Sequence, residues 1–507
     1  MIVTTTNGSV RGGTKEGVHH FLGIPYASAP EGAKRFCAPQ KPAKWSGELD
    51  ATSFGDVCLQ APMPGIFGEI GTPSNDSGPN SLNLNVWTPD LGATKLPVLM
   101  WIHGGAFYAG SGIDEVYDGT AFARDGIVCV TINYRLGAQG FAHLADHFSE
   151  LSDSGNCGLL DQIAALEWIR DNISAFGGDP SNVTIAGESA GGMSVGTLLA
   201  TPRAKGLFRR AIPQSGAAHN GVSAATGSLI AGHLLAEIKV RPGDLDALQK
   251  VSPEDLLAAQ VRLNDELAAT RNPLKFGEAA ASAMLLQPTY GTDILPTKPI
   301  DAIAAGSAKD IDIMVGSNSD ETMIFMVDLK DIFNEELVSA TLDAVMGAVG
   351  RSGDEALETY SKARPTSSSF DLASAFETDR MFRMPAIRLA EAQLKNSKNV
   401  WLYEFCWKSQ ARDGNFGACH FLEVPFVFDR LDNDESRGIA GDAPQALATT
   451  VHAAWVAFIK NGNPNNAHLP DWPAYTIKTR DTMCFDSTSE VRQNPSSDER
   501  VLWDGII

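Results

Sequence analysis

The stretch that decides the fold is VTIAGESAGG, residues 183–192. An apolar β-type run comes first, then a turn of small residues that carries Ser189, and then a helical segment that ends before Pro202. A G-x-S-x-G turn between a strand and a helix is typical of a nucleophile elbow, in which a strained backbone exposes the serine hydroxyl. Because the start of a helix presents unbonded N–H groups, we expect the N–H of Ala190 to stabilise a developing oxyanion.

The rest of the pattern predicts an α/β chain. From residue 96 onward, near-continuous apolar runs predict buried parallel strands. These runs are 98–102, 127–134, 183–186, 211–213, 311–315 and 400–405. Shorter β-type runs at 9–11, 19–24 and 82–87, separated by glycine and proline turns, predict a small antiparallel edge.

Helical patterns fill the intervals between the strands. Apolar residues at three- and four-residue spacing in 159–173 predict a crossover helix packed on the sheet. Two alanine- and leucine-rich stretches, about 220–287 and 323–399, predict helical insertions over the catalytic face. We therefore predict one domain over residues 1–507, in which these helices cover a large, mostly parallel central sheet.

Composition and charge limit the function. With 507 residues, 43% of them hydrophobic, the chain can bury a large core. A formal net charge of −21 argues against nucleic acid and anionic membrane surfaces as partners, because both would repel the protein. The sequence has no signal-peptide or transmembrane pattern, and its seven scattered cysteines without C-x-x-C spacing predict reduced thiols. We expect a cytoplasmic monomer that does not insert into membranes.

An activated serine needs an acid and a base, which follow the nucleophile in the order carboxylate, then histidine, in this kind of fold. The predicted strand at 311–315 is followed by GSNSDET, residues 316–322. Catalytic groups of open α/β sheets gather at the carboxyl ends of strands, so either Asp320 or Glu321 can be the acid.

Three histidines lie beyond that loop. His420 sits in a small-residue loop after the predicted strand at 400–405, where it can reach the same sheet edge. His452 falls within a predicted helix beside Trp455, and His468 lies in an asparagine-rich loop. We predict that His420 is the base.

A second turn supplies the remaining donors. The segment WIHGGAF, residues 101–107, ends a predicted strand with a side-chain-poor H-G-G-A turn, whose backbone can direct N–H groups at a tetrahedral intermediate. We predict an oxyanion hole formed by Gly105, Ala106 and Ala190. No group of His, Cys or carboxylate residues has metal-site spacing, and no G-x-G-x-x-G follows a strand, so we expect neither metal nor cofactor.

Together these motifs resemble the type-B carboxylesterase/lipase family over nearly the whole chain. The segments that carry the resemblance are FLGIPYA (21–27), LNVW (84–87), WIHGGAF (101–107), NYR (133–135), GLLDQ (158–162), GESAG (187–191), QSG (214–216), DE (320–321), and His420 with PFVF (425–428). The resemblance implies an α/β-hydrolase fold and hydrolysis of carboxylic esters through an acyl-enzyme, without a cofactor. It selects Glu321 over Asp320 as the acid, and it implies that Glu188 and Ser215 support the catalytic groups without reacting.

The sequence departs from the family pattern near the site. The family commonly pairs a cysteine matching Cys58 with one in an E-D-C-L segment, but here that segment reads PNSL, residues 79–82, so this disulfide cannot form. Phe421 and Leu422 replace the more usual small pair after His420, which predicts an apolar pocket beside that histidine.

Two other functions are compatible with these residues. The same groups can hydrolyse an amide, a carbamate or a lactone. Some relatives of this fold have lost the serine and act as non-catalytic binding proteins, but this chain keeps every triad candidate. We therefore predict a serine carboxylesterase that acts on a small-molecule ester.

Overall fold

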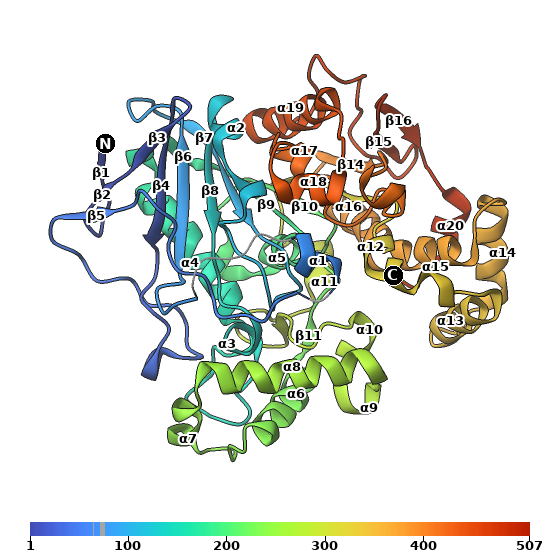
Figure 1. Ribbon diagram of the computed structural model, residues 1–507, viewed down its shortest axis with the longest axis horizontal. Coiled ribbons are helices and arrows are strands. Elements are labelled where there is room, and N and C mark those ends of the chain that lie inside the picture. The colour runs from blue at the N-terminus through green and yellow to red at the C-terminus, as the bar shows by residue number, and fades with distance from the viewer. Residues whose placement is uncertain (64, 71–76) are drawn as a thin grey trace. The chain divides into compact units, whose positions relative to one another are not determined.

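The computed structural model describes residues 1–63, 65–70 and 77–507, and Figure 1 shows its ribbon. These residues form two compact units. The first contains Met1–Met63, the described part of Gly71–Pro213, and Ala218–Ile311. The second contains the described part of Pro64–Ile70, Gln214–Ala217 and Asp312–Ile507. That the whole chain is one domain stays a prediction.

The first unit is built on a mixed sheet. Its strands are β1 (Ile2–Thr4), β2 (Ser9–Arg11), β3 (Gly13–Lys15), β4 (Val18–Pro25), β5 (Glu48–Asp50), β6 (Asn83–Thr88), β7 (Leu96–Ile102), β8 (Val128–Ile132), β9 (Gly178–Glu188), β10 (Arg210–Gln214), β11 (Val222–Ser223) and β12 (Thr289–Tyr290). In the mixed sheet the order is β10-β9-β7-β8-β6-β4-β3, whereas β1, β2 and β5 form a separate three-stranded sheet and β11 pairs with β12 alone. Strand β7 pairs in parallel with β8 and β9, whereas β8, β6, β4 and β3 pair antiparallel in turn. The antiparallel edge expected from the sequence is therefore confirmed for the runs at 19–24 and 82–87, but the run at 9–11 lies outside it, because β2 pairs with β1 and β5 in a separate sheet.

The first unit contains helices in the intervals between its strands. They are α2 (Thr120–Arg124), α3 (Gly137–Phe141), α4 (Cys157–Asn172), α5 (Ala190–Ala200), α6 (Ala224–Glu237), α7 (Leu245–Lys250), α8 (Pro253–Thr270), α9 (Pro273–Phe276), α10 (Ala279–Ser282) and α11 (Pro299–Ala304). Helices α6 to α10, green in Figure 1, occupy the stretch predicted to be helical at 220–287. That they cover a catalytic face stays a prediction.

The second unit has its own parallel core. Its strands are β13 (Asp312–Asn318), β14 (Val400–Phe405), β15 (Asp481–Phe485) and β16 (Glu490–Gln493), and its helices are α1 (Ile66–Ile70), α12 (Met323–Met326), α13 (Glu335–Gly347), α14 (Gly353–Ala363), α15 (Ser369–Thr378), α16 (Met384–Gln393), α17 (Val424–Val427), α18 (Asp434–Ala440), α19 (Gln445–Asn461) and α20 (Ser497–Leu502). Strands β13, β14 and β15 pair in parallel, and β16 pairs antiparallel with β15 at the edge. The polar strand β16 was not expected from the sequence.

Continuous burial explains the apolar strand sequences. The last five residues of β7, from Val98 to Ile102, are each at most 1% exposed. Side chains on both faces of such a strand are removed from water, so the alternation of a half-exposed strand is lost. In the described part of the chain, no helix combines the length and the apolar character needed to cross a bilayer.

A buried ion pair holds the loop after β8 to α4. The guanidinium of Arg135 donates from Nε to Asp161 Oδ2 at 2.8 Å and from Nη2 to Asp161 Oδ1 at 2.7 Å. The backbone N–H of Arg135 also donates to Asp161 Oδ2 at 2.9 Å. With both side chains at most 2% exposed, removal of either partner would leave an uncompensated buried charge.

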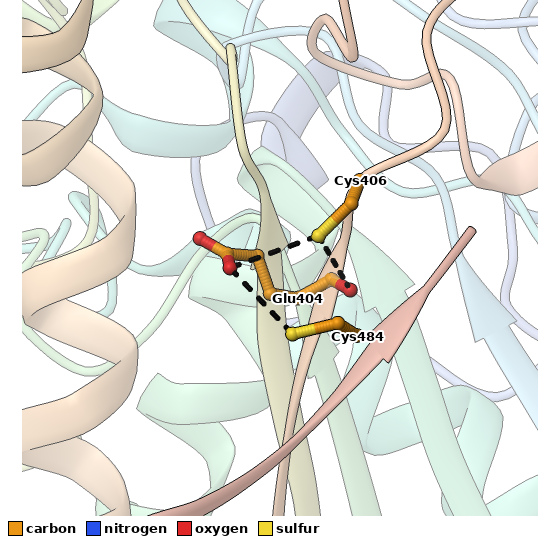
Figure 2. A group of neighbouring side chains, drawn as sticks. All are labelled: Glu404, Cys406 and Cys484. Atoms are coloured by element: carbon orange, nitrogen blue, oxygen red, sulfur yellow. Dashed lines mark hydrogen bonds between the residues drawn. The ribbon is translucent and has the colours of Figure 1, made fainter. Parts of the chain in front are cut away.

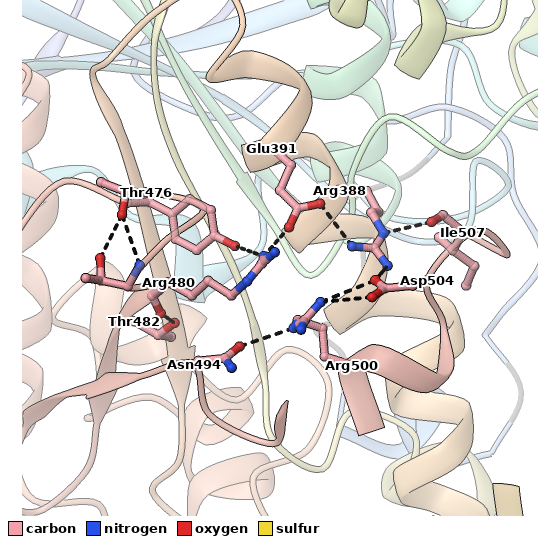
Figure 3. A network of polar contacts seen from close by, with 11 residues as sticks. Arg388, Glu391, Thr476, Arg480, Thr482, Asn494, Arg500, Asp504 and Ile507 are labelled. Carbon is pink, nitrogen blue, oxygen red and sulfur yellow. Dashed lines mark hydrogen bonds and ion pairs between the residues drawn. The ribbon is translucent and has the colours of Figure 1, made fainter. Parts of the chain in front are cut away.

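Helix α16 is tied to the segments around β15 and β16 by a polar network (Figure 3). Arg388 on α16 donates to Asp504 Oδ1 at 2.7 Å, to Glu391 Oε2 at 2.9 Å and to the carbonyl oxygen of Ile507 at 2.7 Å. Glu391 also binds Arg480, the residue that precedes β15. Since these charges share partners, the network fixes α16 more firmly than an isolated surface pair would.

The approach of β9 and α5 to the end of β7 leaves room only for glycine. A Cβ atom added to Gly191 would lie 2.0 Å from the carbonyl oxygen of Ile102, and one added to Gly187 would lie 2.5 Å from the same oxygen. Both glycines flank Ser189 in the sequence. The two small residues therefore let the serine turn sit directly against the carboxyl end of β7.

We predict that Gly191→Ala destabilises the protein, because the added methyl group collides with backbone that cannot turn aside. The expected loss is about 1–3 kcal/mol or more in the free energy of unfolding, measured by urea denaturation. Gly347→Ala is the matched control, since a Cβ at this last residue of α13 would meet no heavy atom within 4 Å. Equal stability of the two variants would contradict this account of the turn.

Candidate active site

The serine turn of the first unit has the geometry of a nucleophile elbow. Ser189 lies between the end of β9 and the start of α5, with φ 56° and ψ −123°. A non-glycine residue with this backbone conformation is strained, and such strain persists only where the surrounding packing enforces it. Ala190 is the first residue of α5, so its N–H has no carbonyl one turn earlier in the helix to bind.

The H-G-G-A turn lies against the same serine. Gly105, Ala106 and Phe107 have successive positive φ values of 105°, 50° and 63°. The N–H groups of Tyr108 and Ala109 both donate to the carbonyl oxygen of Gly105 at 3.0 Å, which closes the turn.

The contact between this turn and the serine is close. A Cβ atom at Gly104 would lie only 3.1 Å from the Cβ of Ser189. Within the described residues, no protein atom accepts a hydrogen bond from the N–H of Gly105 or Ala106. The first unit thus brings together the serine and the expected donors Gly105, Ala106 and Ala190.

His103, just before this turn, is a structural residue. Its Nδ1 donates to the carbonyl oxygen of Gly104 at 2.8 Å. Its ring stacks on that of Tyr134 with the ring centroids 4.5 Å apart, and the Tyr134 hydroxyl donates to the carbonyl oxygen of His103 at 3.0 Å. Burial lowers the pKa of His103 to about 4, so the ring is neutral at neutral pH. The histidine therefore stiffens the turn without adding a charge.

The second unit pairs a buried carboxylate with a buried histidine. Glu321 follows β13, His420 lies in the loop after β14, and the His420 Nδ1 donates to Glu321 Oε2 at 2.6 Å. The other carboxylate oxygen accepts the N–H of Asn318 at 2.8 Å, and the N–H of His420 donates to the carbonyl oxygen of Glu321 at 3.1 Å. With Glu321 fully buried and His420 only 4% exposed, the carboxylate fixes both the tautomer and the orientation of the imidazole.

The neighbouring acid has a different partner. Asp320 Oδ2 accepts the N–H of Ala418 at 2.9 Å, and the N–H of Asp320 donates to the carbonyl oxygen of Ala418 at 3.0 Å. Its carboxylate also lies 3.7 Å from Lys408 Nζ. Asp320 thus ties down the loop that carries His420, while Glu321 contacts the imidazole itself.

Phenylalanine rings surround His420. The ring centroids of Phe382, Phe325 and Phe67 lie 4.8, 5.1 and 6.5 Å from that of the imidazole. Phe382 is buried, whereas Phe325 is 49% exposed. An apolar environment was expected here from Phe421 and Leu422, but nothing in the sequence indicated Phe382, which lies thirty-eight residues before His420 in the π-helical segment Asp379–Arg383 between α15 and α16.

A second buried carboxylate lies next to this pair. Glu423 is fully buried and accepts hydrogen bonds from Asn318 Nδ2 at 2.7 Å and from Gln214 Nε2 at 3.1 Å. Burial, followed by the nearby charge of Glu321, raises the pKa of Glu423 to about 7. Glu423 was not expected from the sequence, because its partners Asn318 and Gln214 lie more than 100 residues before it.

The remaining expected residues are buried as well. Glu188 is 1% exposed and precedes the serine, with Oε2 3.0 Å from where a Cβ of Gly104 would lie. Ser215 has φ 44° and its N–H donates to the carbonyl oxygen of Gly316 at 2.9 Å. His452 lies within α19 and its Nδ1 donates to the carbonyl oxygen of Val427 at 2.7 Å, as expected for a packed histidine.

Comparisons with known proteins show similarity to esterases over nearly the whole chain. A family model described as the carboxylesterase family matches residues 1–503. The chain is 40% identical over 505 residues to the para-nitrobenzyl esterase of Bacillus subtilis (strain 168), a match that covers 99% of this chain and 98% of that protein. It is 34% identical over 491 residues to the phenmedipham hydrolase of Pseudarthrobacter oxydans, covering 94% of this chain and 92% of that protein.

Solved structures give the same result for the fold. A crystal structure of a Geobacillus stearothermophilus carboxylesterase aligns with a TM-score of 0.87 at 38% identity over 99% of both chains. A structure of a PNB esterase aligns with a TM-score of 0.84, also at 38% identity and over 99% of both chains. The expected α/β-hydrolase fold and the expected family are therefore confirmed.

The raised pKa of Glu423 predicts a loss of stability with rising pH. The folded state holds the proton more tightly than the unfolded chain, so stability falls as pH rises from about 4.5 towards 7. We expect Glu423→Gln to remove this decline. Relative to the wild type, the free energy of unfolding of the variant should rise by up to about 3 kcal/mol between pH 5 and pH 8.

Urea denaturation at several pH values measures this difference. Because Asn318 and Gln214 both donate to Glu423, the glutamine variant also loses one hydrogen bond, but that loss does not depend on pH. Glu336→Gln, at an exposed position on α13, is the control. Parallel pH profiles for Glu423→Gln and the wild type would refute the raised pKa.

Proposed function

Since the chain belongs to the carboxylesterase family and is therefore a carboxylic ester hydrolase, we propose that Ser189, His420 and Glu321 form its catalytic triad. The observation that carries the proposal is the buried 2.6 Å contact between His420 Nδ1 and Glu321 Oε2. A histidine oriented in this way needs only an alcohol at its other nitrogen, and the strained turn at Ser189 supports that role for the serine.

The reaction follows from these roles. The Ser189 hydroxyl attacks the ester carbonyl while His420 Nε2 takes its proton, and Glu321 stabilises the imidazolium that forms. His420 then returns the proton to the departing alcohol, which leaves an acyl group on Ser189. Water, activated by the same imidazole, releases the carboxylic acid and restores the serine.

Backbone donors stabilise the charge that develops on the carbonyl oxygen. We assign this role to the N–H groups of Gly105, Ala106 and Ala190, because preorganised donors need no rearrangement during the reaction. The positive φ values of Gly105 and Ala106 and the helix start at Ala190 support the assignment. Glu188 and Ser215 are proposed to hold the catalytic groups in place through the buried backbone around them.

The substrate proposed is a small aromatic or apolar ester, hydrolysed without a cofactor. Phe382 and Phe325 beside His420 support an apolar leaving group or acyl group at that point. The Bacillus relative is named for para-nitrobenzyl esters, which makes that ester the first compound to test.

The setting of the enzyme is proposed to be a reducing one. All seven cysteines carry free thiols, five of them buried, which supports a cytoplasmic location. A single chain supplies every proposed catalytic group, which supports action as a monomer. Light scattering at assay concentration measures that state directly.

Ser189→Ala should lower kcat for p-nitrophenyl acetate by about 1,000-fold or more, because no other group can form the acyl-enzyme. Ser181→Ala, at an exposed position on the same strand β9, is the control and should keep normal activity. Near-normal turnover by Ser189→Ala would exclude the proposed nucleophile.

The two neighbouring acids are separated by their amide variants. Glu321→Gln should lower kcat by about 10³- to 10⁴-fold, because an amide cannot both accept from Nδ1 and stabilise the imidazolium. Asp320→Asn should lower kcat by about tenfold or less, since it only weakens the hydrogen bond that anchors the His420 loop at Ala418. The proposal fails if Asp320→Asn is the more damaging of the two, as measured by initial rates with the folded state checked by circular dichroism.

A further inference from the structure

Three side chains of types that can bind a metal ion meet at the ends of strands β14 and β15, among residues other than the proposed triad (Figure 2). Glu404 lies on β14, Cys406 follows that strand, and Cys484 lies on β15. In the parallel register of the two strands, Glu404 is directly opposite Cys484. Residues directly opposite each other in neighbouring strands point to the same face, so Glu404 and Cys484 project from one side of the sheet, and the Cys406 thiol just past the end of β14 lies beside them.

The ligand atoms are already close together. The Sγ of Cys406 lies 3.7 Å from Glu404 Oε2, and the Sγ of Cys484 lies 4.0 Å from the same oxygen. All three ligand atoms lie within 4.8 Å of one another. Figure 2 shows both thiols directed at the carboxylate.

These separations are near those of a tetrahedral zinc site. Bond lengths of about 2.3 Å to sulfur and about 2.0–2.2 Å to oxygen place two sulfurs about 3.8 Å apart and a sulfur and an oxygen about 3.5 Å apart. The observed distances therefore need to shrink by about 1 Å or less. Side-chain rotation alone can supply such a change.

A disulfide fits the strands less well. Neighbouring strands are about 4.8 Å apart and rise about 3.3 Å per residue, so residues offset by two positions have Cα atoms about 8 Å apart. Cys406 is offset by two from the residue opposite Cys484. Disulfides rarely span Cα separations above about 7 Å, whereas a metal ion between two thiolates bridges a wider gap.

Nearby arginines offset the charge of such a site. Two thiolates and a carboxylate carry three negative charges, of which a divalent cation neutralises two. Arg492 on β16 interacts electrostatically with both cysteines and with Glu404. Arg383 also interacts with Glu404, although its guanidinium is ion-paired with Asp379 as well. These guanidinium groups are suited to stabilising the remaining negative charge.

We propose that Glu404, Cys406 and Cys484 bind one Zn²⁺ ion per chain. Two thiolates select Zn²⁺ over hard cations such as Mg²⁺ and Ca²⁺. Cys406 and Glu404 are partly exposed whereas Cys484 is buried, so the ion enters from the solvent side and water fills its fourth position. Binding releases the two thiol protons, and that of the carboxyl group where it is protonated, to solvent.

Cobalt titration tests the proposal. The full chain, prepared without a polyhistidine tag and stripped with EDTA under reducing conditions, is titrated with Co²⁺. The expected result is a thiolate-to-cobalt charge-transfer absorption in the near ultraviolet, with the visible bands of a four-coordinate ion, saturating at one Co²⁺ per chain. Added Zn²⁺ should then abolish these bands.

Variants assign the ligands. Cys406→Ser and Cys484→Ser should each lose the charge-transfer intensity of their own thiolate and bind the metal at least 10- to 100-fold more weakly, since loss of even an outer-shell partner costs that much. Glu404→Gln should weaken binding while the charge-transfer band stays. Cys37→Ser, at another partly exposed thiol, is the matched control and should bind as the wild type does.

Two results would overturn the proposed zinc site. The proposal fails if the wild type shows no thiolate-to-cobalt absorption at stoichiometric metal, or if the Cys406→Ser, Cys484→Ser double variant binds as tightly as the wild type. Should the buried Cys484→Ser variant not fold, the partly exposed Cys406→Ser variant decides alone. A rise in Tm with Zn²⁺ in the wild type, lost in Cys406→Ser, gives a second reading.

Discussion

The close approach of the Ser189 turn to the carbonyl oxygen of Ile102 is the constraint on which the first unit's part of the site depends. Gly187 and Gly191 allow it, because a side chain at either position would lie within about 2.5 Å of that oxygen. The same approach brings Gly104, and with it the turn that holds the proposed oxyanion donors, against the serine. The backbone thus holds the proposed nucleophile and the proposed donors in place before any substrate binds.

The second unit buries two carboxyl groups, those of Glu321 and Glu423, close to His420. Glu321 contacts His420 and accepts the backbone N–H of Asn318. Glu423 instead accepts from the side-chain amide of Asn318, and its pKa is raised to about 7. Burial therefore drives Glu423 towards its neutral form, while the donors around Glu321 fix the position of the carboxylate that contacts the imidazole.

The features that the sequence predicts best are those formed by short, continuous segments. The elbow, the H-G-G-A turn and strand β14 (Val400–Phe405) were predictable because each depends on a few consecutive residues. The choice between Asp320 and Glu321 could not be made from spacing, since it depends on which way each side chain leaves one short loop. Glu423 and the Glu404, Cys406 and Cys484 group were missed because their neighbours come from strands and loops far away in the sequence.

Covalent labelling of the nucleophile tests the central claim most directly. A p-nitrophenyl dialkyl phosphate phosphorylates an activated serine and releases p-nitrophenolate as it does so. The account predicts one p-nitrophenolate per chain, loss of esterase activity in step with its release, and a single dialkyl phosphoryl adduct located by mass spectrometry on Ser189. An adduct on another residue with Ser189 unmodified, or full activity after Ser189 is labelled, would contradict it.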